Sequence, residues 1–324
     1  MRPEDLDGTD PEGAIAATAK RVSNWGRWGD DIRGTMNFLT ADKRRAAAAL
    51  VRTGASFSLS QSFDMEGPQK GWRRRTNPVH TMLDTGTDAV AGIQGFPHGI
   101  GGADDVIAMP LQCSTQWDGL GHIFDHGIAW NGRPADRVVT SLGDRVTGIE
   151  TVADVVAGRG VLLDVGRVVG KDGELPDGFA ITEEHLEATI AAQGPTSTVG
   201  QGDIVVVRTG QLTRCRRLGW GEYAGGPAPG LSFTTADWLH RTEIAAVATD
   251  TWGFEVRPNE FDDAFQPLHQ VAIPHIGLFI GEMWDPDALA HACAADGHYD
   301  FLLVAAPLKV TGAVGAPVNP VAVR

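Results

Sequence analysis

Short runs of apolar, β-branched residues recur along the chain and predict buried strands. The clearest are VLLDV from Val161, IVVVR from Ile204 and IAAVATD from Ile244, whose composition favours the interior of a sheet. The 41 glycines and 18 prolines predict many turns between such strands. This pattern indicates an α/β fold dominated by its sheet rather than a helical bundle.

Two segments carry a helical pattern with a polar start and a glycine end. Thr40 is a good N-cap for the run DKRRAAAALVRTG, which Gly54 is placed to end. A second helix is predicted from Thr182 to Gln193. Residues 1–60 are predicted to form an N-terminal arm that precedes a main domain of residues 61–324.

The segment LQCSTQWDGLGHIFDHG, from Leu111 to Gly127, spaces its polar residues two apart. In an extended strand, successive side chains point to opposite faces. One face would then carry Gln112, Ser114, Gln116 and Asp118, and the other Leu111, Cys113, Thr115 and Trp117. Such a strand could simply turn its polar face to solvent, or it could present a prepared polar surface to a ligand.

His122 follows Asp118 by four residues, beyond two glycines that allow the backbone to turn sharply. A carboxylate, two amides and an imidazole would then converge. Alternatively, the same residues could serve only to form a turn.

Composition narrows the function classes. The 324 residues are 42% hydrophobic, enough for a large core, and carry a net charge of −14, which argues against nucleic-acid binding. No apolar run is long enough for a membrane helix. The N-terminus lacks the layout of a signal peptide, and three scattered cysteines are too few for a disulfide framework. A cytoplasmic protein is expected.

The only tight basic cluster runs from Arg73 to Arg75. It is either a solvated turn or a clamp on a substrate carboxylate.

The Leu111–Gly127 segment resembles the signature H-x-G-T-H-x-D-x-P-x-H of the cyclase family of metal-dependent hydrolases. Thr115, Asp118 and His122 match the signature. Departures occur at four positions, where the family has His, Gly, His and Pro and this chain has Gln112, Ser114, Gln116 and Leu120.

Two later segments extend the resemblance. HQVAIPHIGLFIGE, from His269 to Glu282, is similar to the family's distal His followed about a dozen residues later by Glu. PAPGLSFTTADWLHRTEIAAVATD, which ends at Asp250, is similar to its "apGL" turn, helix and short strand. The resemblance implies a swivelling β/β/α fold. It also implies that the N-terminal arm embraces a neighbouring subunit, in a homo-oligomer such as a dimer or tetramer.

The resemblance further implies one divalent metal ion, manganese or zinc, held by Asp118, His269 and Glu282 with Gln116 assisting. In the family, the last signature His moves protons, and here that residue is His122. Amide oxygens are hard, neutral ligands, which suit manganese, magnesium or calcium better than zinc. Zinc is therefore not expected at the first family site, where Gln112 and Gln116 replace two imidazoles.

Other residues are candidates for binding substrate. His80 could line the pocket from a loop, and Asp250 ends a predicted strand, where α/β folds place function. Trp117, Trp252 and Phe254 could wall an apolar pocket. His275 is a competing metal ligand. The substrate-binding set we predict is Gln112, His80, Trp117 and Asp250.

Two functions remain open. The first is a metal-dependent hydrolase that opens a cyclic amide, a lactone or an N-formyl amide of a small aromatic or cyclic substrate. The alternative is a metal-free lyase, cyclase or ligand-binding descendant that uses the same pocket.

Overall fold

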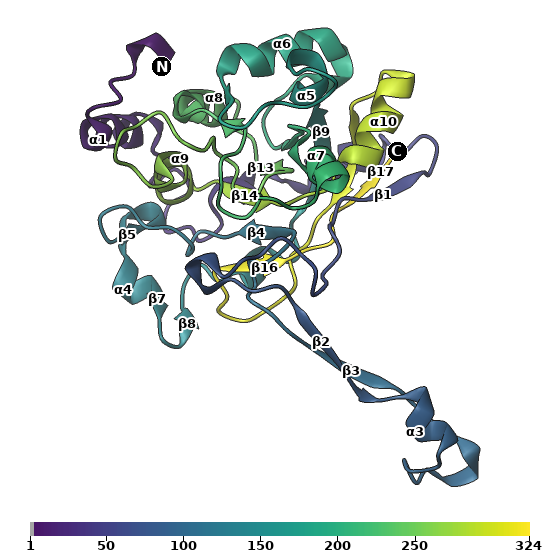
Figure 1. Ribbon diagram of the computed structural model, residues 1–324. Helices are drawn as coiled ribbons and strands as arrows, with labels where there is room; N and C mark the ends of the chain where they lie inside the picture. The colour runs from purple at the N-terminus through teal and green to yellow at the C-terminus, as the bar shows by residue number, and fades with distance from the viewer. Residues whose placement is uncertain (1–2) are drawn as a thin grey trace.

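The computed structural model, which describes residues 3–324, is built around one mixed sheet of nine strands (Figure 1). The strand order is β1-β17-β15-β9-β11-β13-β14-β4-β16. In chain order their bounds are Ser56–Ser58 (β1), Gln116–Asp118 (β4), Ala157–Leu163 (β9), Ile204–Val207 (β11), Ala246–Thr249 (β13), Phe279–Glu282 (β14), Asp300–Val304 (β15), Gly315–Pro317 (β16) and Val321–Val323 (β17).

The centre of the sheet is parallel and fully buried. Strands β9, β11, β13 and β14 run side by side in the same direction, and the residues of β11, β13 and β14 are all buried. A parallel sheet is covered on both faces, so its strands are continuously apolar rather than alternating. The three predicted strands and the sheet-dominated α/β class are confirmed.

Ten α-helices connect and cover these strands within the described residues; Figure 1 shows most of them on one side of the sheet. Their bounds are Pro11–Val22 (α1), Ala41–Ala48 (α2), Gly86–Val90 (α3), Ala135–Val138 (α4), Val165–Val169 (α5), Glu183–Gln193 (α6), Gln211–Leu218 (α7), Ala236–Arg241 (α8), Pro267–Val271 (α9) and Asp287–Asp296 (α10). None of the helices among residues 3–324 is both long and apolar enough to span a bilayer.

The two predicted helices are present, but one is shorter than expected. Helix α6 begins after Thr182, which forms a capping box with His185. Helix α2 begins after the N-cap Thr40 as predicted but ends at Ala48 rather than at Gly54. The chain leaves the helix early because the backbone N–H groups of residues 53 and 54 both donate to the Arg324 carbonyl, which ties this segment to the C-terminal strand.

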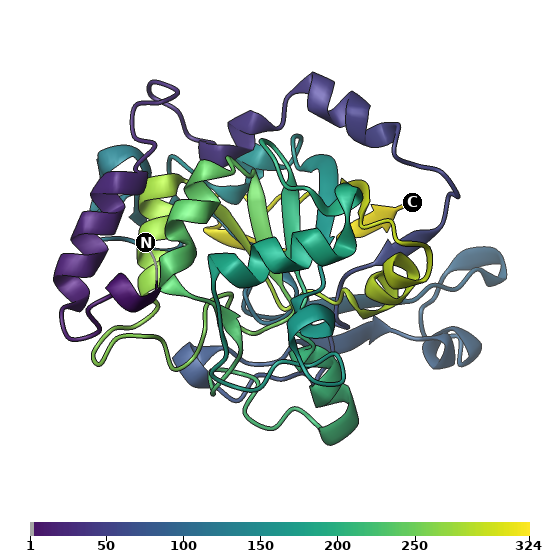
Figure 2. The same cartoon turned by 90° about the horizontal axis from the view of Figure 1, so that it is seen from above.

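Within residues 3–60, α1 lies against α8 and α9, and α2 lies against β9. The element that projects is a hairpin of β2 (Val79–Asp84) and β3 (Asp104–Ala108), tipped by α3. It extends away from the sheet in both views (Figures 1 and 2). The remaining small sheets pair Ile128–Ala129 (β5) with Arg133–Pro134 (β6), Val139–Thr140 (β7) with Gly143–Asp144 (β8), and Ala180–Ile181 (β10) with Gly230–Leu231 (β12).

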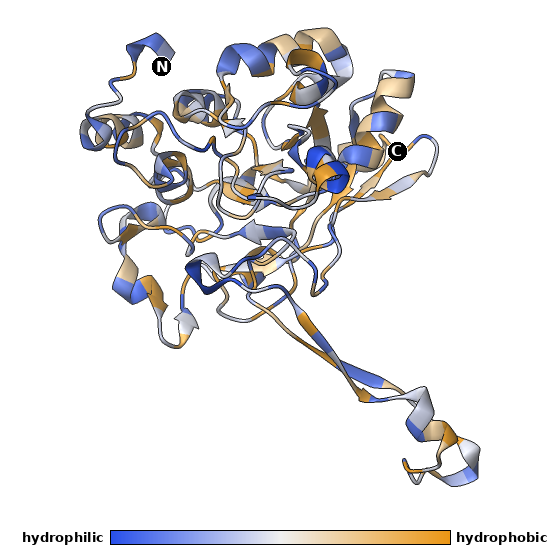
Figure 3. Cartoon of the chain, in the orientation of Figure 1, coloured by the Kyte–Doolittle hydropathy of each residue, from blue (hydrophilic) through white to orange (hydrophobic). Residues whose placement is uncertain are grey.

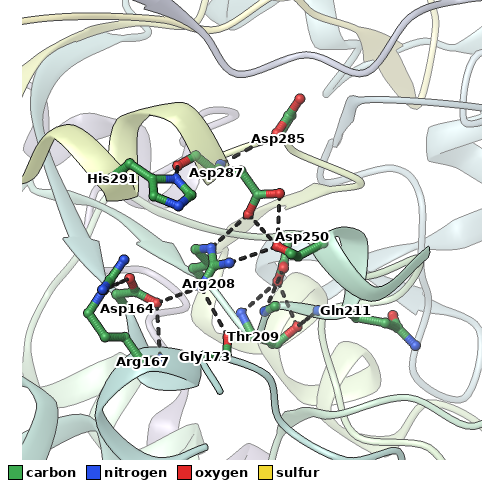
Figure 4. A network of polar contacts seen from close by, with 12 residues as sticks. Asp164, Arg167, Gly173, Arg208, Thr209, Gln211, Asp250, Asp285, Asp287 and His291 are labelled. Atoms are coloured by element: carbon green, nitrogen blue, oxygen red, sulfur yellow. Dashed lines mark hydrogen bonds and ion pairs between the residues drawn. The ribbon is translucent and has the colours of Figure 1, made fainter. Parts of the chain in front are cut away.

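A buried charge network joins the carboxyl ends of three neighbouring strands (Figure 4). Asp164, Arg208 and Asp250 each come directly after the last residue of β9, β11 and β13. The Arg208 guanidinium donates to Asp164 at 2.9 Å and to Asp287, at the start of α10, at 2.7 Å. This arrangement holds the strand ends and α10 together.

Arg208→Met should lower the free energy of unfolding by roughly 3–5 kcal/mol, the usual cost of removing one partner from a buried ion pair. Asp164 and Asp287, which are both buried, would lose the buried cation between them and keep only the partly exposed Arg167 and Arg216. Urea denaturation measures the loss. Arg137→Met is the matched control: its side chain is 83% exposed, and it should change stability by no more than about 0.5 kcal/mol. Equal stability of the two variants would contradict this account.

Candidate active site

The predicted strand over residues 111–118 is wrong in its first part: only Gln116–Asp118 forms a strand, β4. Residues 111–115 turn instead, with the Cys113 N–H donating to the Pro110 carbonyl at 3.2 Å. The proline starts this turn, so the alternation of faces holds for three residues only. Trp117 accordingly lies on the core side, where its ring packs edge-on to Trp284 with centroids 4.9 Å apart.

Two carboxylates and one imidazole converge on the other face of β4. In the antiparallel pairing of β4 with β14, Glu282 lies opposite Gln116, so both side chains project from one face. His269 arrives from α9. The ligand atoms of Asp118, His269 and Glu282 all lie within 4.8 Å of one another, and each residue is buried. The structure thus brings together the three principal predicted ligands.

His269 is held by Glu255, a residue that the sequence analysis missed. The Glu255 carboxylate bonds to His269 Nδ1 and accepts the backbone N–H groups of Leu268 and His269 at 3.0 and 3.1 Å. It therefore orients the imidazole and also satisfies free N–H groups at the start of α9. Nothing in the local sequence marks it, because residues 14 apart in the chain meet only in the fold.

His269 Nε2 faces Glu282 Oε1 at 3.0 Å. Burial opposes a positive charge on His269, but the hydrogen bonds and charges of Glu255 and Glu282 outweigh it and raise its pKa from 6.5 to about 10. The pair of carboxylates thus favours a cation between them, either a proton on Nε2 or a metal ion in its place.

The donor set fits one divalent cation. Two carboxylates and an imidazole are ligands for manganese and zinc, and a carboxylate on the far ring nitrogen, as Glu255 provides, is the usual support of a metal-bound histidine. Gln116 lies beside these ligands: its Nε2 donates to Glu282 at 2.9 Å, while its buried Oε1 has no hydrogen-bond partner. An unpaired buried oxygen beside two acids is a further place for a cation to bind.

His122 borders this cluster without entering it. Its Nε2 lies 3.6 Å from Asp118 Oδ1, and its side chain is 12% exposed. Burial lowers the pKa of His122 below 6.5, although the Asp118 charge opposes this, so the ring is neutral at neutral pH. Burial also raises the pKa of Asp118. The glycines predicted to shape this turn are needed: a Cβ at Gly121 would lie 2.2 Å from Asp144 Oδ2.

Gln112 reaches the edge of the cluster. Its buried Nε2 has no partner and lies 2.8 Å from where a Cβ at Gly315 would be. Gly315 in turn pairs with Asp118 across β16 and β4. Phe254, a predicted pocket wall, packs edge-on to His269 with ring centroids 4.6 Å apart.

Three other candidates lie apart from the cluster. His80 is on strand β2 of the projecting hairpin, not on a loop, and bonds to Asp105 at 2.8 Å. Asp250 accepts from the backbone N–H groups of Thr209 and Gly210 at 2.7 and 2.8 Å, within the Arg208 network (Figure 4). His275 bonds to Asp125 at 2.8 Å. The substrate contacts predicted for His80 and Asp250 stay predictions.

Comparisons with known proteins agree with the fold and with the family. The sequence model of a family described as "Putative cyclase" matches residues 57–256. The crystal structure of a novel cyclase is 40% identical, with a TM-score of 0.85, and the match covers 93% of this chain and 99% of that chain.

Two isatin hydrolases share the fold at lower identity. Isatin hydrolase A from Ralstonia solanacearum is 14% identical with a TM-score of 0.60, over 86% of this chain and 93% of that chain. An isatin hydrolase bound to the product analogue thioisatinate is 16% identical with a TM-score of 0.59, over 87% and 98%. No curated protein matches the chain.

Proposed function

The chain belongs to the cyclase family, and we propose that it is a metal-dependent hydrolase that opens an amide or lactone bond in a small cyclic or aromatic substrate. The observation that carries the proposal is the convergence of Asp118, His269 and Glu282 within 4.8 Å, next to a neutral His122. The names of the isatin hydrolases that share the fold agree with this chemistry.

Asp118, His269 and Glu282 would hold the cation, with Gln116 Oε1 as a further ligand. A divalent cation bound there polarises a carbonyl and lowers the pKa of water. Glu255 keeps the His269 ring in place through Nδ1, so that Nε2 remains the ligand atom.

His122 acts as the general base. Its neutral ring accepts a proton from the attacking water, whose oxygen bonds to the substrate carbonyl carbon. The same ring then gives that proton to the leaving nitrogen or oxygen as the amide or lactone bond breaks. The products are an amine or alcohol and a carboxylic acid, which releases its proton to solvent, so the step needs no other reactant.

The test is elemental analysis of the natively purified protein together with a screen of lactones, cyclic imides and N-formyl anilines. We expect about one equivalent of manganese or zinc, hydrolysis of at least one substrate, and loss of both on chelation. A protein that turns over these substrates without metal, or that contains no metal after native purification, would refute metal-dependent hydrolysis.

A second candidate is a metal-free cyclase, lyase or binding protein, and one observation favours it. The Gln116 amide donates to Glu282 at 2.9 Å and lies 3.5 Å from Asp118 Oδ1, while a protonated His269 would bridge Glu255 and Glu282. Hydrogen bonds alone would then join the carboxylates. The absence of metal in the elemental analysis, with activity retained, would select this function.

For the assembly, we propose that the β2–β3 hairpin contacts a second copy of the chain. Its tip exposes large apolar side chains, with Val90, Ile93, Phe96 and Ile100 between 57% and 93% exposed. In Figure 3 parts of the chain at the end of the hairpin are coloured as hydrophobic. Exposed apolar surface of this kind favours a protein contact.

The charges of the hairpin favour a copy of the same chain. Residues 76–132 contain no lysine or arginine, and the β2–β3 hairpin carries four aspartates (Asp84, Asp88, Asp104 and Asp105). Arg74, at the base of the hairpin, is exposed and has no ion-pair partner among the described residues. Each copy therefore offers both the acidic hairpin and a free cation that an acidic hairpin can pair with.

Light scattering after gel filtration should give a dimer or tetramer, and Val90→Asp with Ile93→Asp should give a monomer. A monomeric unmodified protein would refute this contact.

A further inference from the structure

Arg75 is a buried cation without a counter-ion. It is 9% exposed, and its guanidinium lies over the Trp252 ring at 5.1 Å from the centroid. No side-chain hydrogen bond or ion pair joins it to any residue in the described range 3–324. A buried guanidinium loses hydration that a ring contact replaces only in part. Such a group is suited to receive an anion.

The backbone around Arg75 is constrained to place it there. Arg73 and Arg74 both adopt left-handed backbone, with φ of 51° and 64°, a conformation that costs of order 1–3 kcal/mol at a non-glycine residue. The Trp252 ring that Arg75 covers donates its Nε1–H to Gln69 Oε1 at 3.3 Å. The Gln69 amide in turn donates to the Cys113 carbonyl at 2.7 Å, next to Gln112 in the chain. Arg75 is therefore linked through two side chains to the segment that leads into β4.

Aromatic rings and two further arginines continue this surface. Trp72 packs edge-on to Trp252 at 4.9 Å and tilted on Phe265 at 5.6 Å. The guanidinium groups of Arg73 and Arg257 lie 5.5 to 5.9 Å from the ring centroids of Trp72 and Phe265. Neither arginine forms an ion pair within the described residues. Three cations and three rings thus gather without a carboxylate partner.

A cavity of about 230 Å³ borders this surface. Its lining includes Arg257 and Phe265 from the surface, and Glu255, which holds His269. Pockets for drug-sized ligands are roughly 300–1,000 Å³. The ligand that fits here is accordingly a small one.

We propose that this cluster, Arg75 with Trp72, Trp252, Phe265, Arg73 and Arg257, binds the carboxylate of a small aromatic acid. Arg75 pairs with the carboxylate, and the rings pack against the aromatic part. The inference rests on the proposed function for the reaction, because the bond that breaks would lie on the Asp118 side of the same molecule. Binding itself does not depend on that reaction.

The test measures binding rather than turnover, with benzoate as probe and benzamide as its neutral counterpart. Isothermal titration should show that benzoate binds at least roughly tenfold more tightly than benzamide. Arg75→Met should weaken benzoate binding by roughly 10- to 100-fold, the scale of a hydrogen bond to a charged group, and leave benzamide binding unchanged. Arg75→Lys should restore part of the affinity for benzoate.

Arg137→Met is the control. Arg137 has an 83% exposed side chain and makes none of the ring contacts, so its loss should leave benzoate binding unchanged. Unfolding curves check that each variant is folded, and Arg257→Met replaces Arg75→Met if the latter fails to fold.

Two results would overturn the inference: equal affinity of the unmodified protein for benzoate and benzamide, or unchanged benzoate binding in Arg75→Met. Benzoate could also bind a metal ion, so the titration is repeated after chelation. Binding that disappears with the metal and not with Arg75 would assign the carboxylate to the ion. If the chain proves metal-free and inactive, the proposed function fails, while benzoate binding to Arg75 would still stand.

Discussion

Glu282→Gln should remove the metal and nearly all of the hydrolytic activity. The Glu282 carboxylate lies 3.0 Å from His269 Nε2. It also accepts a hydrogen bond from the Gln116 amide at 2.9 Å. The substitution keeps the shape but removes one of the two negative charges that would face the cation. Loss of a supporting residue alone costs roughly 10- to 100-fold in metal affinity or activity, and loss of a charged ligand should cost at least as much. Elemental analysis and kcat/KM measure the two effects.

Gln112→Ala is the control for this variant. Gln112 borders the cluster and has a free Nε2, but the three converging ligand atoms come from Asp118, His269 and Glu282. Metal content should therefore change little. If Gln112→Ala loses its metal while Glu282→Gln retains it, the cation lies on the Gln112 side, at the place of the family's first site.

The sequence pattern correctly predicted the elements that are determined by neighbouring residues in the chain. The apolar runs from Val161 and Ile204 became buried parallel strands, and Thr182 caps α6 as expected. The helix after Thr40 came out too long because its end is set by contacts with Arg324, at the far end of the chain. The strand over residues 111–118 came out too long because a turn at Pro110 takes its first half.

The candidate site divides in the same way. Asp118, His269 and Glu282 could be predicted because their order and spacing form a motif. Glu255 could not, because it matters only through His269, a neighbour distant in sequence. The basic cluster from Arg73 to Arg75 was visible as either a turn or a carboxylate clamp, but only the contact with Trp252 singles out Arg75 within it. The hairpin of β2 and β3 was missed for a related reason. An apolar segment usually predicts a buried element, but the apolar tip of this hairpin is exposed.

His122→Ala should retain the metal and still bind substrate, while kcat falls by roughly two to four orders of magnitude, the usual scale for loss of a general base. The ring stands outside the three ligand atoms, with Nε2 3.6 Å from Asp118 Oδ1, which is too long for a direct hydrogen bond. It can therefore meet the attacking water. Elemental analysis and steady-state kinetics separate the two parts of this prediction.

The pH dependence of kcat gives a second measurement of the same role. Burial lowers the pKa of His122 below 6.5, so the neutral base is present above that pKa, and activity should fall as the pH drops through it. This acidic limb, below pH 6.5, should be absent from the residual activity of His122→Ala, which no longer has the titrating ring. Loss of the metal in the variant would make His122 a ligand, and near-normal turnover would remove it from the mechanism.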